Sequence, residues 1–263
     1  MTEKSVAIVT GAGGDIGRAI AAALASTHHI AAVDIDRPAA QRTAAALHAQ
    51  GGQASIHQCD LTDAGDRARL ATEIADIGTV GLLVNNAGAA QALSLHELTA
   101  EALHADIALN LEAAINMFKQ FEGDLKQAGC VINIASVNGM ATFGHPGYSA
   151  AKSGLIHFTR MLAVEYGRYG LRANAVAPGT VRTQAWEDRQ AKNPQVFEDA
   201  ARWYPLRRVA DPTDVAAAVA FLASPSAGAI TGVCLPVDCG LTAGSPPLPA
   251  TFTQTNDFTG NDT

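Results

Sequence analysis

Short runs of β-branched and aliphatic residues alternate with alanine-rich segments along almost the whole chain. Seven such runs are present, each of the length of a single strand. Parallel strands buried on both faces are continuously apolar, and most of these runs are. Because crossovers between parallel strands are nearly always right-handed, the alternation predicts a doubly wound α/β domain, a parallel sheet of about seven strands with helices on both faces. The predicted strands span residues 5–10, 30–34, 54–59, 80–84, 130–135, 171–176 and 232–237.

The spacing of apolar residues predicts helices between these strands. Residues four apart lie on one face of a helix, so a row with this spacing can pack on the sheet. Three rows have it: Ile16, Ile20 and Leu24; Leu103, Ile107 and Leu111; and Leu155, Thr159 and Ala163.

No change in composition marks an internal linker, so residues 1–244 are predicted to form one domain. Within it, residues 180–208 carry four aromatic residues between two turn signals. We interpret this stretch as a substrate lid, because long insertions in compact domains are usually functional; an ordinary helical excursion is the alternative. Residues 245–263 form a tail rich in proline and threonine, for which disorder and docking on the domain both stay open.

Charge and cysteine content argue against several kinds of partner. Lysine and arginine total 18 against 25 acidic residues, a formal charge of −7 without any basic run, so no nucleic acid is expected to bind. The cysteines at 59, 130, 234 and 239 form no CxxC pair, so no metal site is expected, and reduced thiols suit a cytoplasmic protein. The chain has no signal-peptide pattern and no apolar stretch of the ~18 residues that a membrane helix needs, so no membrane partner is expected.

The first predicted strand runs directly into a glycine-rich turn that opens a helix. Such a turn aims unpaired N–H groups at one point, and glycines such as Gly11 and Gly13 let a pyrophosphate come close. Asp34 ends the second predicted strand, where its carboxylate can accept hydrogen bonds from a ribose. Together these features predict a Rossmann-type dinucleotide site. Asp34 would repel a 2′-phosphate, so NAD is expected rather than NADP, although Arg37 could pair with that phosphate and Asp36 could compete for the ribose.

These features resemble the short-chain dehydrogenase/reductase family, and the resemblance covers about residues 5–244. The family pattern Thr-Gly-x-x-x-Gly-x-Gly is met by Thr10, Gly11 and Gly17, but Asp15 replaces its middle glycine. An Asp15 that faces outward or caps the helix would leave cofactor binding intact, whereas one that faces inward would weaken it.

Further family landmarks follow in order along the chain. They are Asp60, Asn85-Asn86-Ala87-Gly88, Pro178-Gly179-Thr180 and Val237-Asp238-Cys239-Gly240, with Cys239 in place of a glycine. The glycine turn and the resemblance together predict that the cofactor contacts Gly11, Gly13, Asp15, Ile16, Asp34, Asp60, Leu61, Asn86, Ala87, Gly88, Tyr148, Lys152, Pro178, Gly179, Val181 and Thr183.

The predicted catalytic residues are Ser136, Tyr148 and Lys152. Tyr148 and Lys152 are four apart, so on a helix they project from one face. A nearby ammonium and the charge of oxidised nicotinamide would favour the phenolate of Tyr148, which would then exchange a proton with the substrate oxygen. Ser136 would hydrogen-bond that oxygen. It lies 12 residues before Tyr148, where many relatives have 13, and the resemblance adds Asn110 as support for a proton relay.

The resemblance implies an oxidoreductase that moves a hydride between the nicotinamide and a secondary alcohol or ketone. Ser136, Asn138, His145, Tyr148 and Trp186 are the candidate substrate contacts. It also implies a homotetramer or homodimer built on the helices of Asn110 and Tyr148 and on the last strand and helix. A dinucleotide sensor or scaffold without catalysis is the alternative. Related enoyl reductases have a lysine seven residues after the tyrosine, where this chain has Leu155, and sugar epimerases usually need a larger carboxyl-terminal domain.

Overall fold

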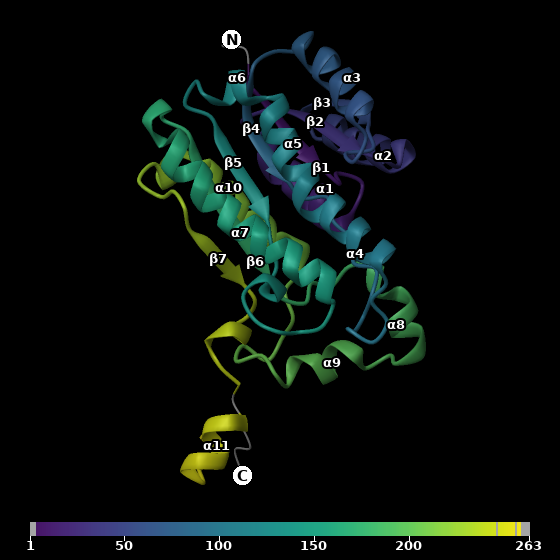
Figure 1. Cartoon of the computed structure of the whole chain (residues 1–263), viewed down its shortest axis with the longest axis vertical. Helices are drawn as coiled ribbons and strands as arrows, with labels where there is room; N and C mark the ends of the chain where they lie inside the picture. The colour runs from purple at the N-terminus through teal and green to yellow at the C-terminus, as the bar shows by residue number, and fades with distance from the viewer. Residues whose placement is uncertain (1–3, 246, 256, 259–263) are drawn as a thin grey trace.

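A seven-stranded parallel sheet forms the centre of the protein (Figure 1). The structure, a computed structural model, describes residues 4–245, 247–255 and 257–258, apart from the side chains of residues 188 and 189. The strands lie in the order β3-β2-β1-β4-β5-β6-β7. They are β1 (Val6–Thr10), β2 (His29–Asp34), β3 (Gln53–Gln58), β4 (Val80–Asn85), β5 (Cys130–Ile134), β6 (Arg172–Pro178) and β7 (Cys234–Val237). The predicted fold class is thus confirmed.

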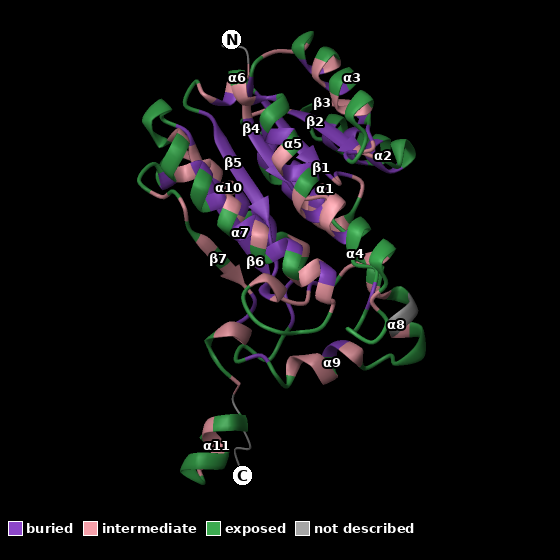
Figure 2. Ribbon diagram, in the orientation of Figure 1, coloured by how far each residue is buried: buried purple, intermediate pink, exposed green. Residues whose placement is uncertain are grey.

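Helices cover both faces of the sheet because alternate strand residues point to opposite sides. In β1, Ala7 and Val9 join the core under α1, α2 and α10, whereas Val6 and Ile8 join the core under α3, α5 and α7. The helices are α1 (Asp15–Leu24), α2 (Arg37–Ala49), α3 (Ala64–Ala75), α4 (Ala100–Ile107), α5 (Ala113–Gln120), α6 (Glu122–Leu125), α7 (Pro146–Tyr166), α8 (Glu187–Lys192), α9 (Val196–Ala201), α10 (Pro212–Ala223) and α11 (Pro247–Thr253). Figure 2 shows the buried sheet between partly exposed helices.

One predicted helix face is wrong. The row that begins at Leu103 does not supply the buried side of its helix, since Leu103 itself is exposed. The buried residues there are Asp106 and Asn110, and a π-helical turn, Ala108–Glu112, joins α4 to α5. The helix packs closely on α7, where a Cβ on Gly147 would lie 2.6 Å from Asp106 Oδ2. Polar residues therefore occupy the inner face here.

The predicted lid segment forms two short helices, α8 and α9, below the carboxyl end of the sheet (Figure 1). A bridge between Val181 and Ala210 joins its two ends. The described part of the tail contains α11, which stands apart from the domain in Figure 1; residues 246, 256 and 259–263 of the predicted tail lie outside the described part. Among the helices that the structure describes, none has the length and apolarity to span a membrane.

Candidate active site and nucleotide crevice

The order in which successive strands are added to the sheet reverses at β1: β2 and β3 lie on one side of it, and β4 to β7 lie on the other. Such a reversal opens a crevice outside the carboxyl ends of the strands, which is where doubly wound folds bind ligands. Two cavities lie there, of about 1020 and 1050 Å³. They share a set of lining residues, so they form one continuous crevice: Ile16, Asn86, Gly88, Ala89, Thr183 and Ala185.

The turn after β1 needs glycine for close packing. Gly11 has φ +63°, in the left-handed region that side chains disfavour. A Cβ on Gly17 would lie 2.1 Å from the carbonyl oxygen of Gly11, so α1 can start against this turn only without a side chain there. The open end of α1, with its N–H groups, therefore faces the cavity of about 1050 Å³, whose wall includes Gly11, Gly13 and Gly17.

Thr10 and Asn86 hold this turn against the end of β4. The Thr10 hydroxyl accepts hydrogen bonds from the backbone N–H groups of Asn86 and Ala87 at 2.9 and 3.0 Å. The Asn86 side chain donates to the carbonyl oxygens of Thr10 and Gly11 at 2.9 and 3.2 Å. These bonds fix the two sides of the crevice relative to each other.

The far end of the crevice carries the acidic residues predicted from the sequence. Asp34 accepts from the N–H groups of Gly13 at 2.8 Å and Asp36 at 2.9 Å, so its carboxylate closes the glycine turn as well as lining the cavity. Arg37, the cation considered from the sequence, is absent from the described lining. Arg42, one turn further along α2, lines it instead. Arg42 was not considered from the sequence, because its position on the crevice depends on the register of α2.

Asp15 has a different role from either of the two predicted. Its Oδ1 forms an ion pair with Arg18 at 2.7 Å, and its Oδ2 accepts from the Gln184 N–H at 2.7 Å. The carboxylate lines the crevice, but both of its oxygens are engaged. It therefore ties the first turn of α1 to the predicted lid segment, with its charge balanced by Arg18.

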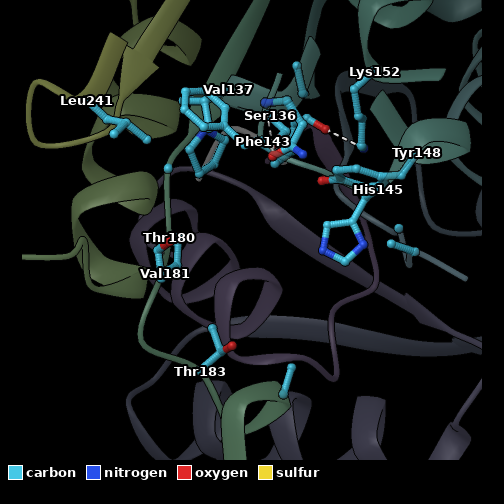
Figure 3. Close-up of a pocket in the computed structure, with 18 of the residues that line it drawn as sticks. Ser136, Val137, Phe143, His145, Tyr148, Lys152, Thr180, Val181, Thr183 and Leu241 are labelled. Carbon is cyan, nitrogen blue, oxygen red and sulfur yellow. Dashed lines mark hydrogen bonds between the residues drawn. The ribbon is translucent and has the colours of Figure 1, made fainter. Parts of the chain in front are cut away.

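Ser136, Tyr148 and Lys152 meet at the wall of the other cavity (Figure 3). Ser136 follows β5 and begins a 3-10 turn, while Tyr148 and Lys152 project from α7. A Cβ on Gly139 would lie 2.7 Å from the carbonyl carbon of Lys152, so glycine lets the loop after Ser136 pack directly on α7. The spacing of 12 residues between Ser136 and Tyr148 thus still brings both to one cavity.

Lys152 is almost completely buried, with 2 % of its surface exposed. Its Nζ donates to the carbonyl oxygen of Ile134 at 2.7 Å and lies 5.4 Å from the centre of the Tyr148 ring. Burial lowers the pKa of Lys152 to about 7. Burial also raises the pKa of Tyr148, although a hydrogen bond with Ser136 offsets part of the rise. Without the positive charge of a bound oxidised nicotinamide, on which the expectation from the sequence also relied, burial therefore favours the neutral phenol.

Asn110 lies behind Lys152 in the π-helical turn, a feature frequent at functional sites. Its Nδ2 donates to the carbonyl oxygens of Ala89 and Asp106 at 2.7 and 2.9 Å. Its buried Oδ1 has no partner among the described residues. A Cβ on Gly88 would lie 2.7 Å from this Oδ1 and 3.3 Å from the Lys152 Nζ, so glycine at 88 is what leaves room for both groups.

The three other predicted substrate contacts, Asn138, His145 and Trp186, also line the cavity of Ser136, Tyr148 and Lys152. Asn138 Nδ2 donates to the carbonyl oxygen of Gly144 at 3.0 Å, which holds the loop before α7. Sequence reasoning missed several wall residues: Leu93, Phe143, Trp203, Tyr204, Leu241 and Ser245. Two of them, Trp203 and Tyr204, lie in the predicted lid, whose aromatic content was the available signal.

All of the predicted cofactor residues line one cavity or the other. Asn110 is the one predicted catalytic residue that does not, because it lies behind the wall. Within the described part of the chain, no group of histidine, cysteine and acidic side chains could hold a metal ion.

Known proteins with similar sequences and structures share this arrangement of the chain. A family model described as enoyl-(acyl carrier protein) reductase matches residues 11–242. An oxidoreductase of the short-chain dehydrogenase/reductase family from Burkholderia thailandensis has a crystal structure with TM-score 0.88 and 44 % identity, covering 97 % of this chain and 99 % of its own. An uncharacterized oxidoreductase of Schizosaccharomyces pombe is 38 % identical over 97 % of this chain and 98 % of its own length.

A third similar protein was solved with a nucleotide. It is a putative NAD(P)-dependent gluconate 5-dehydrogenase from Beutenbergia cavernae with bound NADP at low occupancy, 32 % identical, with TM-score 0.85 over 92 % of this chain and 98 % of its own. The family model spans most of the chain and the relatives cover nearly all of it. The chain therefore belongs to the short-chain dehydrogenase/reductase family of oxidoreductases.

Proposed function

We propose that this protein is an NAD-dependent dehydrogenase/reductase that moves a hydride between the nicotinamide and a secondary alcohol or ketone, with Tyr148 as the general acid and base. The observation that carries the proposal is the meeting of Ser136, Tyr148 and Lys152 at one cavity wall. That cavity continues into the crevice of the glycine turn. A substrate oxygen at this wall would thus lie beside a proton donor and next to the end of a bound dinucleotide.

The residues present fit a dinucleotide. The open first turn of α1 and the glycines around it suit a pyrophosphate, and Asp60 and Leu61 line the far end with Asp34. Asn86, Ala87 and Gly88 would border the adenosine half. Pro178, Gly179, Val181, Thr183, Tyr148 and Lys152 would hold the nicotinamide half. When bound, the cofactor would supply the hydride acceptor or donor.

The side chains at the wall divide the proton chemistry among them. Tyr148 would donate its proton to a ketone oxygen during reduction and take it back from the alcohol during oxidation. Ser136, which is 7 % exposed and bonded to Asn138, would donate to the same oxygen as negative charge grows there. Lys152 would hold the cofactor ribose and, through Asn110, connect Tyr148 to solvent.

NAD is the proposed cofactor because Asp34 ends β2 with its carboxylate on the crevice, where a 2′-phosphate would be repelled. Arg42 is the opposing observation, since a guanidinium on the same wall could pair with that phosphate. The Beutenbergia relative, described as NAD(P)-dependent, was solved with NADP, which is why both cofactors are compared in the assay. We expect kcat/KM to be higher with NAD than with NADP in the assay below.

The experiment compares the wild type with Tyr148→Phe on a panel of secondary alcohols with each cofactor. We expect Tyr148→Phe to lose at least a hundredfold in kcat, because general acid–base groups typically contribute that much or more. NADH binding, measured by fluorescence, should persist in the variant. Equal turnover by the two proteins would refute the role of Tyr148.

A sensor or scaffold that keeps the fold without the chemistry is the alternative function. It is disfavoured because Asn110, Ser136, Tyr148 and Lys152 are all present. Enoyl reduction, the description of the matching family model, is also disfavoured, since residue 155 is a leucine. We further propose residues 180–208 as the lid, a homotetramer or homodimer as the assembly, and the cytoplasm as the compartment of a protein whose four cysteines are all free.

A further inference from the structure

We propose that His145 is a substrate-binding residue that selects an uncharged alcohol with a second hydroxyl group next to the reacting carbon, that is, a vicinal diol or its α-hydroxyketone. This inference rests on the proposed function, because it assigns the substrate class of the same site. Three observations carry it: the backbone of His145, the hydrogen bond of its ring, and the character of the remaining wall.

The backbone at His145 is strained. The residue has φ +53° and ψ +67°, in the left-handed region that non-glycine residues rarely adopt, and it directly precedes Pro146. Such strain persists only where the surroundings enforce it, and it is concentrated at functional sites. Here the His145 N–H donates to the carbonyl oxygen of Leu93 at 3.1 Å, and its carbonyl accepts from the Ser149 N–H at 2.8 Å.

The ring of His145 is fixed by a bond that also decides its tautomer. Nδ1 lies 3.2 Å from the carbonyl oxygen of Ala92. A carbonyl oxygen only accepts, so Nδ1 must carry the proton, and in the neutral ring Nε2 is left as a hydrogen-bond acceptor. His145 lines the cavity, and Figure 3 shows its ring below Tyr148, across the open centre of the view from Thr180 and Val181. The structure gives Nε2 no partner among the described residues.

The position of this acceptor relative to the proton donor sets the spacing in the substrate. The rings of His145 and Tyr148 lie edge to face with their centres 6.4 Å apart. Because the two rings are neighbours, a substrate that hydrogen-bonds to both side chains, with bonds of about 2.8 Å, must carry its two oxygens close together, as on adjacent carbons. One oxygen would meet Tyr148 and Ser136, and the hydroxyl beside it would donate to His145 Nε2.

The remaining wall is suited to an uncharged, largely apolar body. The described residues that line this cavity include a single lysine and no arginine, aspartate or glutamate, and the Lys152 ammonium already donates to the Ile134 carbonyl. Among the described side chains of this wall, a carboxylate or phosphate on the substrate would therefore find no second cation. Apolar and aromatic side chains make up much of the wall: Leu93, Val137, Phe143, Trp186, Trp203 and Leu241.

The test compares 1-phenylethane-1,2-diol, 1-phenylethanol and mandelate as substrates of the wild type, His145→Phe and His96→Phe. His96 is an exposed histidine outside both cavities, which makes His96→Phe the matched control. We expect the wild type and the control to prefer the diol over 1-phenylethanol by about tenfold in kcat/KM, the effect of one hydrogen bond. In His145→Phe the ratio should fall to about one. Mandelate, which has a carboxylate in place of the second hydroxyl carbon, should be the poorest substrate of all three proteins.

A second variant tests whether a loss of preference comes from misfolding, and a binding measurement tests the same hydrogen bond without turnover. Asparagine tolerates the left-handed backbone but is too short to reach both Ala92 and the cavity, so His145→Asn should lose the preference as well. In the Tyr148→Phe background with NADH bound, 2-hydroxyacetophenone should bind about tenfold more tightly than acetophenone, and His145→Phe should abolish the difference.

The outcomes separate the two proposals. A wild type that turns over alcohols without preferring the diol, or a preference that survives in both His145 variants, overturns the role of His145 and leaves the proposed function standing. Faster turnover of mandelate than of the diol overturns the uncharged substrate class. A wild type that oxidises none of the alcohols although it binds NADH refutes the proposed function, and the inference with it.

Discussion

The charge states of two side chains, the buried Lys152 and the half-buried Tyr148, set the chemistry at this wall. The Lys152 ammonium is removed from water, which lowers its pKa to about 7, and burial raises the pKa of Tyr148. Neutral phenol is therefore the resting form of Tyr148 near neutral pH, so the residue is ready to donate a proton. Oxidation of an alcohol needs the opposite form, which becomes available only as pH rises or as the positive nicotinamide binds nearby.

These directions predict opposite pH profiles for the two reactions. A raised pKa means that deprotonation of Tyr148 occurs at higher pH, so kcat/KM for oxidation should increase with pH from 7 toward 10. Reduction needs the protonated phenol and should be constant near neutral pH and fall at high pH. Initial rates in both directions, measured in buffers of constant ionic strength, check this. An oxidation rate that is highest below pH 7 would contradict the assignment.

Single residues also show where sequence reasoning succeeds. Tyr148 and Lys152 were predictable because a fixed spacing on one helix determines which side chains share a face. Arg42 and Phe143 were not, since their contribution depends on the register of α2 and on a loop conformation that no periodic pattern encodes. Asp15 was predicted to contact the cofactor, but its bond to the Gln184 N–H joins residues 169 positions apart and depends on the path of the lid segment.

Between the elements, a buried polar network ties the central strands to α7. Asn85 on β4 donates to Asn133 on β5 at 2.8 Å, and Asn133 donates to Thr159 on α7 at 2.9 Å. All three side chains are buried. Since α7 carries Tyr148 and Lys152, this network helps to place the catalytic helix on the sheet that carries Ser136.

Replacement of Asn133, the middle residue of this network, by alanine should therefore lower the free energy of unfolding. Asn133→Ala leaves the Asn85 amide buried without its partner, at a cost of about 1–3 kcal/mol, and also removes the bond to Thr159, whose hydroxyl keeps its bond to the Leu155 carbonyl oxygen. We expect a loss of about 2–4 kcal/mol in the free energy of unfolding, measured by urea denaturation. Gln41→Ala, on the exposed side of α2, is the control and should change it little. A change below 0.5 kcal/mol in Asn133→Ala would show that water replaces the lost partner.

The pattern of apolar residues explains which strands and helices were predictable from the sequence. All seven strands lie within two residues of their predicted bounds. The central strands were predictable because a parallel strand buried on both faces is apolar at most positions, whereas the edge strand β3 is partly exposed and polar at several positions. The second helical row failed because periodicity treats apolar residues as buried. Asp106 and Asn110 take the inner face there, where their side chains bond to the backbone of Gln91 and Ala89. Hydrogen bonding of this kind leaves no signal in an apolar pattern.

At the scale of the whole molecule, several apolar side chains are exposed, and we define two apolar surfaces from those on the elements of the predicted assembly. One lies on α4 and α7 and includes Leu103, Met161 and Val164, which is 83 % exposed. The other lies on α10 and the edge strand β7 and includes Phe221 and Leu235. These are the elements on which the assembly was predicted. Two separate self-complementary surfaces generate a tetramer with D2 symmetry, whereas one generates a dimer.

We therefore expect a particle of four times the 27.1 kDa chain mass in sedimentation at micromolar concentration. Val164→Glu places a charge on the first surface, where burial without a partner is costly, so this variant should sediment as a dimer held by the second surface. Gln41→Glu adds the same charge to α2, away from both surfaces, and should leave the tetramer intact. Tyr148 and Val164 lie on the same helix, α7. The Val164→Glu dimer should therefore also lose activity, because it lacks the subunit contact that supports this helix. A monomeric wild type, or a tetramer that persists in Val164→Glu, would show that α7 is not the interface helix.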